Sequence, residues 1–113
     1  MKRIITLLCI ICIVAQVYAW KPLFAGHRGS YRGVENTEEA FMNGINHYGY
    51  TGLEIDVKTT SDGEYVCWHD DDLSRVGHEG VSIPNSKWAD IKDLTLTQTR
   101  SGNTYTGKLC SVD

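Results

Sequence analysis

Apolar and polar residues alternate in the run LEIDV, which is the clearest strand signal in the chain. Because successive side chains of a strand point to opposite faces, Leu53, Ile55 and Val57 share one face. Glu54 and Asp56 share the other face. We predict a strand whose apolar face packs against the core. Its acidic face either holds a cation or is simply solvated at an exposed sheet edge.

The pattern before this strand predicts an earlier strand and a helix. Residues 22–26 are a short apolar run that is typical of a buried strand, and a glycine-rich loop follows them. Asn36, with Glu39 three residues later, is expected to cap a helix that Gly49 ends. The apolar stripe of this helix consists of Ala40, Phe41, Gly44, Ile45 and Tyr48. Together these elements predict a βαβ unit of a parallel sheet.

The rest of the pattern predicts a third strand, a loop, a short helix and a hairpin. Residues 64–68 have the composition of a strand, and residues 71–85 are expected to form a loop. Ser86 is expected to cap a short helix. One side of that helix carries Trp88, Ile91 and Leu94. Residues 100–103 are typical of a hairpin turn between two polar strands.

The first 19 residues differ from the rest of the chain. Lys2 and Arg3 precede an apolar run over residues 4–14, and small or medium-sized residues follow at the positions that a signal peptidase reads. This run is shorter than the roughly 20 apolar residues of a transmembrane helix. We therefore predict a signal peptide over residues 1–19. Residues 20–113 are then an exported domain, periplasmic or extracellular, with no stable membrane span after cleavage.

Charge and cysteine content change the picture in two ways. Cleavage after residue 19 removes two of the 11 basic residues and none of the 14 acidic ones, so the formal net charge moves from −3 to −5. This acidity argues against a nucleic-acid partner. Cys67 and Cys110 remain, and they either form one disulfide in an oxidising compartment or leave Cys67 as a buried thiol. The oligomeric state stays open.

Side chains that bind cations or move protons follow the predicted strands. His27 follows the first strand, Glu54 and Asp56 lie near the end of the second, and His69 follows the third. In parallel α/β sheets and barrels, function gathers at these strand ends. Two histidines can take and give a proton, and two carboxylates suit Ca²⁺ or Mg²⁺. Arg28 offers a guanidinium that suits a phosphate, so the set predicts cleavage of a phosphate ester.

Each candidate also has a purely structural interpretation. His27 can cap a strand end within its glycine-rich loop, and His69 can be a surface histidine paired with the acids at residues 70–72. That acidic run is itself interpreted as a solvated turn. His47 and His78 have no comparable setting, and we assign them to a helix surface and a loop.

Five motifs occur in an order that resembles one enzyme family. They are Gly26-His27-Arg28-Gly29, Glu35-Asn36-Thr37-x-x-Ala40-Phe41, LEIDV, Asp62-Gly63 and His69-Asp70-x-x-Leu73-x-Arg75. Over residues 23–94 the chain resembles the N-terminal part of the glycerophosphodiester phosphodiesterase family. Val34 stands where that family usually has a proline. By this resemblance the Glu35-Asn36-Thr37 segment shapes the first loop of the site, and Glu35 approaches the metal.

The resemblance implies a fold and a reaction. The fold is a TIM-type (β/α)8 barrel, which takes roughly 250 residues and eight strands. Residues 20–113 are therefore expected to form only its N-terminal part, an incomplete α/β domain. The reaction is metal-dependent hydrolysis of glycerophosphodiesters, which are small-molecule substrates, to glycerol 3-phosphate and an alcohol. The family's third metal-binding carboxylate is expected beyond residue 113.

The resemblance also implies residue roles. His27 and His69 match the acid–base pair, Glu54 and Asp56 match ligands of a divalent cation, and Arg28 matches a contact to the substrate phosphate. Two alternatives stay open. The 113-residue chain is a truncated and catalytically inactive fragment, or it belongs with related barrel phospholipases that act on intact lipid and share the histidine pair and the acidic strand.

Overall fold

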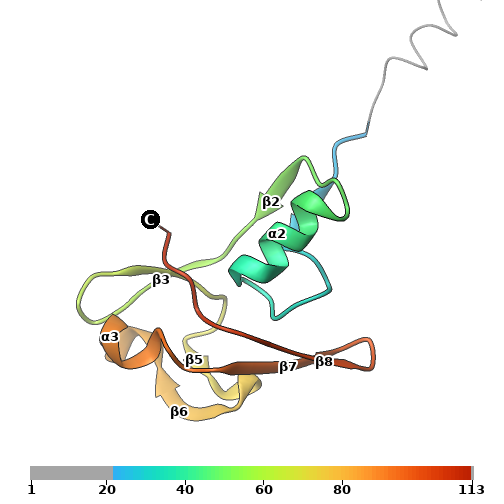
Figure 1. Ribbon diagram of the computed structural model, residues 1–113. Helices are drawn as coiled ribbons and strands as arrows, with labels where there is room; N and C mark the ends of the chain where they lie inside the picture. The colour runs from blue at the N-terminus through green and yellow to red at the C-terminus, as the bar shows by residue number, and fades with distance from the viewer. Residues whose placement is uncertain (1–21, 113) are drawn as a thin grey trace, which may run out of the picture.

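The computed structural model describes residues 22–112, so the predicted signal peptide over residues 1–19 lies outside it. Within the described residues, no helix is long and apolar enough to cross a membrane. The strands of this part of the chain form four two-stranded sheets. The described chain is thus an incomplete α/β piece with short strands (Figure 1).

The first unit of the fold is a strand–helix–strand crossover. Strand β1 (Ala25–His27) pairs in parallel with β2 (Gly52–Glu54), and helix α2 (Glu38–Asn46) connects them (Figure 1). The predicted βαβ unit is therefore confirmed. The register places His27 directly beside Glu54 at the C-terminal ends of both strands.

The boundaries of α2 differ from the prediction. Thr37, not Asn36, is the N-cap, and its Oγ1 accepts a hydrogen bond from the Ala40 N–H (3.4 Å). Asn36 has a φ of 55° and uses its side chain elsewhere, as described below. The helix ends at Asn46, three residues before Gly49. On the predicted apolar stripe, Ala40 and Gly44 are buried but Ile45 is 47% exposed in the described chain.

The LEIDV run is split between two strands. Strand β2 ends at Glu54, and β3 (Val57–Thr59) pairs with β4 (Tyr65–Cys67) in the antiparallel direction. The third predicted strand exists, but it does not extend a parallel sheet. The connection from β3 to β4 is too short for a parallel crossover, which needs about a dozen residues or more. The prediction that Ile55 and Val57 face the core is wrong, since both are exposed in the described chain.

Residues 71–85 are not a loop. They form β5 (Asp72–Leu73), the 3₁₀ helix η1 (Ser74–Val76), β6 (His78–Ser82) and the 3₁₀ helix η2 (Ile83–Asn85), with β5 and β6 antiparallel. The reason is burial: Leu73, Val76 and Ile83 are fully buried and fix this segment on the core.

The last elements follow the prediction in outline. Helix α3 (Trp88–Ile91) forms, but Lys87 is its N-cap because the Ser86 hydroxyl donates to the Ser82 carbonyl instead (2.7 Å). Strands β7 (Leu96–Arg100) and β8 (Asn103–Gly107) form the predicted hairpin. The apolar core lies among β4, β5, the two 3₁₀ helices η1 and η2, helix α3 and the β7–β8 hairpin. It consists of Val34, Val66, Trp68, Leu73, Val76, Ile83, Ile91, Leu96 and Leu109.

Candidate functional site

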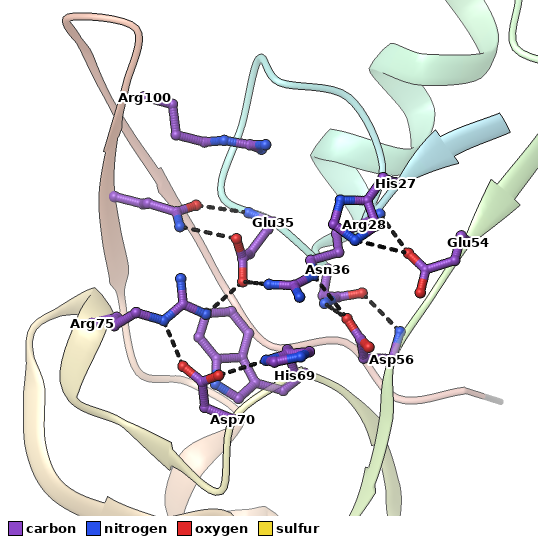
Figure 2. Close-up of polar contacts among 12 residues, drawn as sticks. His27, Arg28, Glu35, Asn36, Glu54, Asp56, His69, Asp70, Arg75 and Arg100 are labelled. Carbon is purple, nitrogen blue, oxygen red and sulfur yellow. Dashed lines mark hydrogen bonds and ion pairs between the residues drawn. The ribbon is translucent and has the colours of Figure 1, made fainter. Parts of the chain in front are cut away.

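The four main candidate residues lie in one polar cluster. Figure 2 shows His27 and Glu54 together at the ends of β1 and β2, with Asp56 and His69 nearby. His27 Nε2 lies 3.9 Å from Glu54 Oε2, and the side chains are 74% and 48% exposed. The parallel pairing of β1 with β2 explains this proximity. The site is open to solvent on the His27 side.

Arg28 connects the cluster to the first loop, which lies between β1 and α2. Its backbone has a φ of 56°, and its N–H donates to Glu54 Oε2 (3.0 Å). Its guanidinium donates from Nη1 to Glu35 Oε1 (3.0 Å). The buried Nε lies 3.2 Å from Asp56 Oδ2, close enough for an ion pair but without the alignment of a hydrogen bond. Within the described residues Nη2 has no hydrogen-bond partner, so this nitrogen is available to a ligand.

Glu35 is the centre of the polar network. Its side chain is only 8% exposed, and Oε1 accepts from both Arg28 and Arg75, the latter at 2.6 Å. The Gln98 amide of β7 donates to Oε2 (3.2 Å) and accepts from the Glu35 N–H (3.0 Å). Burial alone would raise the pKa of Glu35, but the hydrogen bonds from Arg75 and Gln98 outweigh it and lower the pKa. Glu35 is therefore held ionised.

His69 is held by its neighbour in the sequence. His69 Nδ1 lies 2.6 Å from Asp70 Oδ1, and Arg75 Nε donates to the other oxygen of Asp70 (2.5 Å). The hydrogen bonds from Arg75 and His69 lower the pKa of Asp70, so its carboxylate stays ionised. This contact occupies Nδ1 and leaves Nε2 of His69 as the nitrogen that can meet a ligand.

Asp56 is positioned by Asn36. The Asn36 amide donates to Asp56 Oδ2 (2.9 Å), and its Oδ1 accepts from the Asp56 N–H (3.2 Å). This pairing, rather than helix capping, is what Asn36 does in the fold. The Asn36 side chain is fully buried, so the contact fixes the carboxylate at one place in the cluster.

A continuous series of polar contacts connects the two candidate histidines. It runs through His27, Glu54, Arg28, Glu35, Arg75, Asp70 and His69 (Figure 2). The hairpin β7–β8 braces the series, since Arg100 Nη1 donates to the carbonyl of Ser30 in the first loop (2.9 Å). His47 and His78 make no contact with this series, and His78 Nε2 instead lies 2.9 Å from the Thr95 carbonyl oxygen.

Several members of the network were not predicted. Gln98 and Arg100 belong to a hairpin that the sequence places more than 60 residues from the first loop, and no local pattern links them to it. Arg75 belongs to the same motif as His69, which indicates that it lies near the site but does not identify its partner. In the structure its guanidinium is bound to Glu35 and Asp70.

The two strand-end acids fit a hard divalent cation. Glu54 and Asp56 each use one carboxylate oxygen in the contacts above, and within residues 22–112 the other oxygen accepts no hydrogen bond. No group of three or more His, Cys, Asp or Glu side chains in this part of the chain is arranged to hold a metal ion. Two carboxylates completed by water and a substrate phosphate are a common arrangement for Mg²⁺.

The chain is similar to a curated protein and to solved structures that carry the same kind of name. A "Glycerophosphodiester phosphodiesterase" from Caldanaerobacter subterraneus subsp. tengcongensis is 36% identical over 80 residues, which are 69% of this chain and 29% of that protein. The crystal structure of a glycerophosphoryl diester phosphodiesterase from Parabacteroides distasonis matches with a TM-score of 0.65 and 29% identity, over 80% of this chain and 32% of that one. A glycerophosphodiester phosphodiesterase from Thermotoga maritima matches with a TM-score of 0.64 and 33% identity, over 82% and 37%.

This chain thus spans about a third of the length of these relatives. The sequence model of the glycerophosphoryl diester phosphodiesterase family matches residues 26–112, which contain every candidate site residue named above. The resemblance predicted from the spaced motifs is confirmed. The chain belongs to the glycerophosphoryl diester phosphodiesterase family.

Proposed function

We propose that the protein containing this segment hydrolyses glycerophosphodiesters to glycerol 3-phosphate and an alcohol. One observation carries the proposal: both imidazoles and both strand-end carboxylates lie in one cluster that a continuous series of contacts holds together (Figure 2). The family of the chain and the names of its relatives support the same reaction. The proposal includes export by a signal peptide over residues 1–19, as the basic and apolar pattern there indicates.

The fold proposed for the whole protein is a TIM-type barrel. The parallel unit of β1, α2 and β2 is the repeating unit of such a barrel. His27 and Glu54 lie at the C-terminal ends of β1 and β2, where barrel enzymes bind their substrates, and Arg28 and Asp56 follow directly after them. The antiparallel hairpin β7–β8 stands outside that repeat and braces the first loop of the site.

In the proposed site, Glu54 and Asp56 would hold a divalent cation, Ca²⁺ or Mg²⁺, since each keeps one carboxylate oxygen that accepts no hydrogen bond in the described residues. When bound, the cation neutralises the substrate phosphate and the charge that develops on it. Arg28 contacts the same phosphate through Nη2. Its other guanidinium nitrogens face Glu35 and Asp56, so the side chain is held in place before substrate arrives.

The two histidines share the proton transfers. We assign His27 as the base that takes a proton from water or from a neighbouring hydroxyl of the substrate. His69 is the acid that gives a proton to the leaving alkoxide. Asp70 acts on His69 as a positioning residue, because its contact with Nδ1 directs Nε2 toward the substrate.

The test compares two proteins and two substrates. The 113-residue chain is assayed beside a chimera in which the C-terminal part of the Caldanaerobacter relative follows residue 112. We expect the chimera to release glycerol 3-phosphate from glycerophosphocholine and to lose this activity in excess EDTA. Full activity in EDTA would contradict the cation site. Preference for intact lysophospholipid or sphingomyelin would instead support the related phospholipase function.

The inactive alternative concerns the 113-residue chain by itself. Several large apolar side chains, among them Leu23, Phe24 and Val57, are exposed in the described residues. An active chimera together with an inactive short chain would show that the site residues are competent but need the remaining length of the relatives.

A further inference from the structure

Cys67 and Cys110 lie opposite each other on neighbouring segments. The Cys67 N–H donates to the Cys110 carbonyl oxygen (2.9 Å), and the adjacent residues Val66 and Ser111 form an antiparallel bridge. Both cysteines carry free thiols. Residues that face each other in an antiparallel pair have Cα atoms about 4.5–5.5 Å apart. This separation falls within the range of roughly 4.4–6.8 Å that disulfides span.

Both cysteines lie on one open hollow of the described chain, Cys67 buried and Cys110 half-buried. Interaction with Cys110 lowers the pKa of Cys67, and interaction with Cys67, together with burial, raises the pKa of Cys110. The pair therefore gives up its first proton more readily than an isolated buried thiol. In the described chain both cysteines line an open hollow of about 670 Å³, together with Phe41, Leu53 and Ile55. Cys110 is the more exposed of the two thiols.

We propose that Cys67 and Cys110 are an oxidation site that closes to an intramolecular disulfide. The bond joins β4 to the C-terminal segment that follows β8. In the described structure, residues 110–112 contact β4 through two backbone hydrogen bonds, Cys67 N–H to the Cys110 carbonyl and Val112 N–H to the Tyr65 carbonyl. The proposal does not depend on the proposed hydrolase activity, because it concerns only the two thiols and their geometry.

The chemistry needs an oxidised disulfide as co-reactant, and oxidised glutathione serves. The thiolate of one of the two cysteines displaces one glutathione thiolate and forms a mixed disulfide. The thiolate of the other cysteine then attacks the protein sulfur of this mixed disulfide, which breaks it and releases the second glutathione. The protein loses two thiol protons and two electrons, and the co-reactant becomes two molecules of reduced glutathione.

The disulfide would change one contact of the candidate site. The reduced Cys110 thiol donates to the Asn36 carbonyl oxygen (3.5 Å), and the Asn36 side chain holds Asp56. Oxidation removes the S–H donor and replaces a weak hydrogen bond with a covalent tie in the neighbouring segment. The loop that carries Glu35 and Asn36 therefore lies next to the oxidised pair.

The experiment maps disulfides in the full 113-residue chain. The chain is incubated with oxidised glutathione and cut with trypsin. Cleavage after Lys58, Arg75 and Lys108 separates peptide 59–75, which carries Cys67, from peptide 109–113, which carries Cys110. The other two cysteines, Cys9 and Cys12, fall in peptide 4–28, because trypsin does not cut the bond between Lys21 and Pro22. Mass spectrometry therefore distinguishes the Cys67–Cys110 linkage from every linkage that involves Cys9 or Cys12.

We expect the linked pair of peptides 59–75 and 109–113, two hydrogens lighter than their sum, to be the dominant product. The same treatment in guanidinium chloride is the control, where four cysteines have three pairings and this one forms in about a third of molecules. The variant Cys110→Ser should leave Cys67 free or glutathionylated. Equal pairing in buffer and in denaturant, or separate glutathionylation of both cysteines, would overturn the proposal.

Discussion

At the scale of single residues, the Glu35 carboxylate neutralises the positive charges of Arg28 and Arg75. Glu35→Gln keeps the shape but leaves Arg28 and Arg75 without their shared anionic partner. Because the carboxylate is almost fully buried, we expect the free energy of unfolding to fall by about 3 kcal/mol. Urea denaturation followed by circular dichroism measures this change. Glu79→Gln is the matched control, since Glu79 is exposed and forms no ion pair within the described residues.

The same residue predicts how stability depends on pH. The folded-state pKa of Glu35 lies below its ordinary value of 4.5 because the hydrogen bonds of Arg75 and Gln98 outweigh the effect of burial. Ionised Glu35 therefore stabilises the fold above about pH 4.5, and this contribution is lost as the pH falls below that value and through the folded-state pKa. We expect the urea midpoint to drop across this range. In Glu35→Gln the drop should be smaller, and an identical pH profile would contradict the assignment.

His69 predicts an effect on catalysis rather than on folding. The His69 side chain is 45% exposed, and its contact with Asp70 is open to solvent. We therefore expect His69→Ala to leave the thermal midpoint close to that of the wild type. In the chimera we expect turnover to fall by about 10²–10⁴-fold, as for the loss of a proton-transfer group. His47→Ala, at the exposed end of α2, should keep the wild-type rate. A His69 variant with full turnover would remove this residue from the mechanism.

At the scale of elements, the sequence predicts structure best where local signals agree. The βαβ unit and the hairpin β7–β8 were predicted because apolar spacing and turn residues indicate the same elements. Residues 71–85 are predicted to form a loop because Gly77, Gly80 and Pro84 are typical of loops. This signal outweighs that of the three buried apolar residues that hold the segment on the core. Residues 64–68 are expected to join the parallel sheet, whereas β4 pairs with β3 in the antiparallel direction. The short connection between the two strands favours this antiparallel pairing.

The hairpin turn predicts a stabilising substitution. Ser101 and Gly102 have φ values of 50° and 79°, so both central residues of the turn lie in the left-handed region. Asparagine followed by glycine is the pair that this turn type prefers, whereas serine is strained there. We expect Ser101→Asn to raise the free energy of unfolding by about 0.5–1 kcal/mol and Gly102→Ala to lower it by a similar amount. Thermal unfolding of both variants tests this, and a destabilised Ser101→Asn would contradict the turn geometry.

At the scale of the whole molecule, the candidate site illustrates which contacts a sequence can reveal. The rule that parallel strands bring their ends to one edge accounts for His27 and Glu54. The structure places Asp56 and His69 near them although β4 is antiparallel (Figure 2). The individual contacts of Glu35 with Arg75 and with Gln98 follow from no such rule. They join the first loop to Arg75 and to Gln98, which are 40 and 63 residues away, and long-range pairs of this kind leave no periodic pattern. Sequence patterns therefore predict helices, strands and the residues at their ends, but not the individual side-chain contacts between distant segments.

The exposed apolar surface leads to a prediction about association. Ile55 and Val57 are 40% and 46% exposed beside a two-stranded parallel sheet whose outer edges are unpaired in the described chain. Exposed apolar groups next to open strand edges favour contact between molecules. We expect the 113-residue chain to self-associate with rising concentration in sedimentation velocity. Ile55→Lys with Val57→Lys should shift it toward monomer, whereas Ala89→Lys with Thr97→Lys, at exposed positions of α3 and β7, should not. A chain that stays monomeric at every concentration would show that this surface does not drive association.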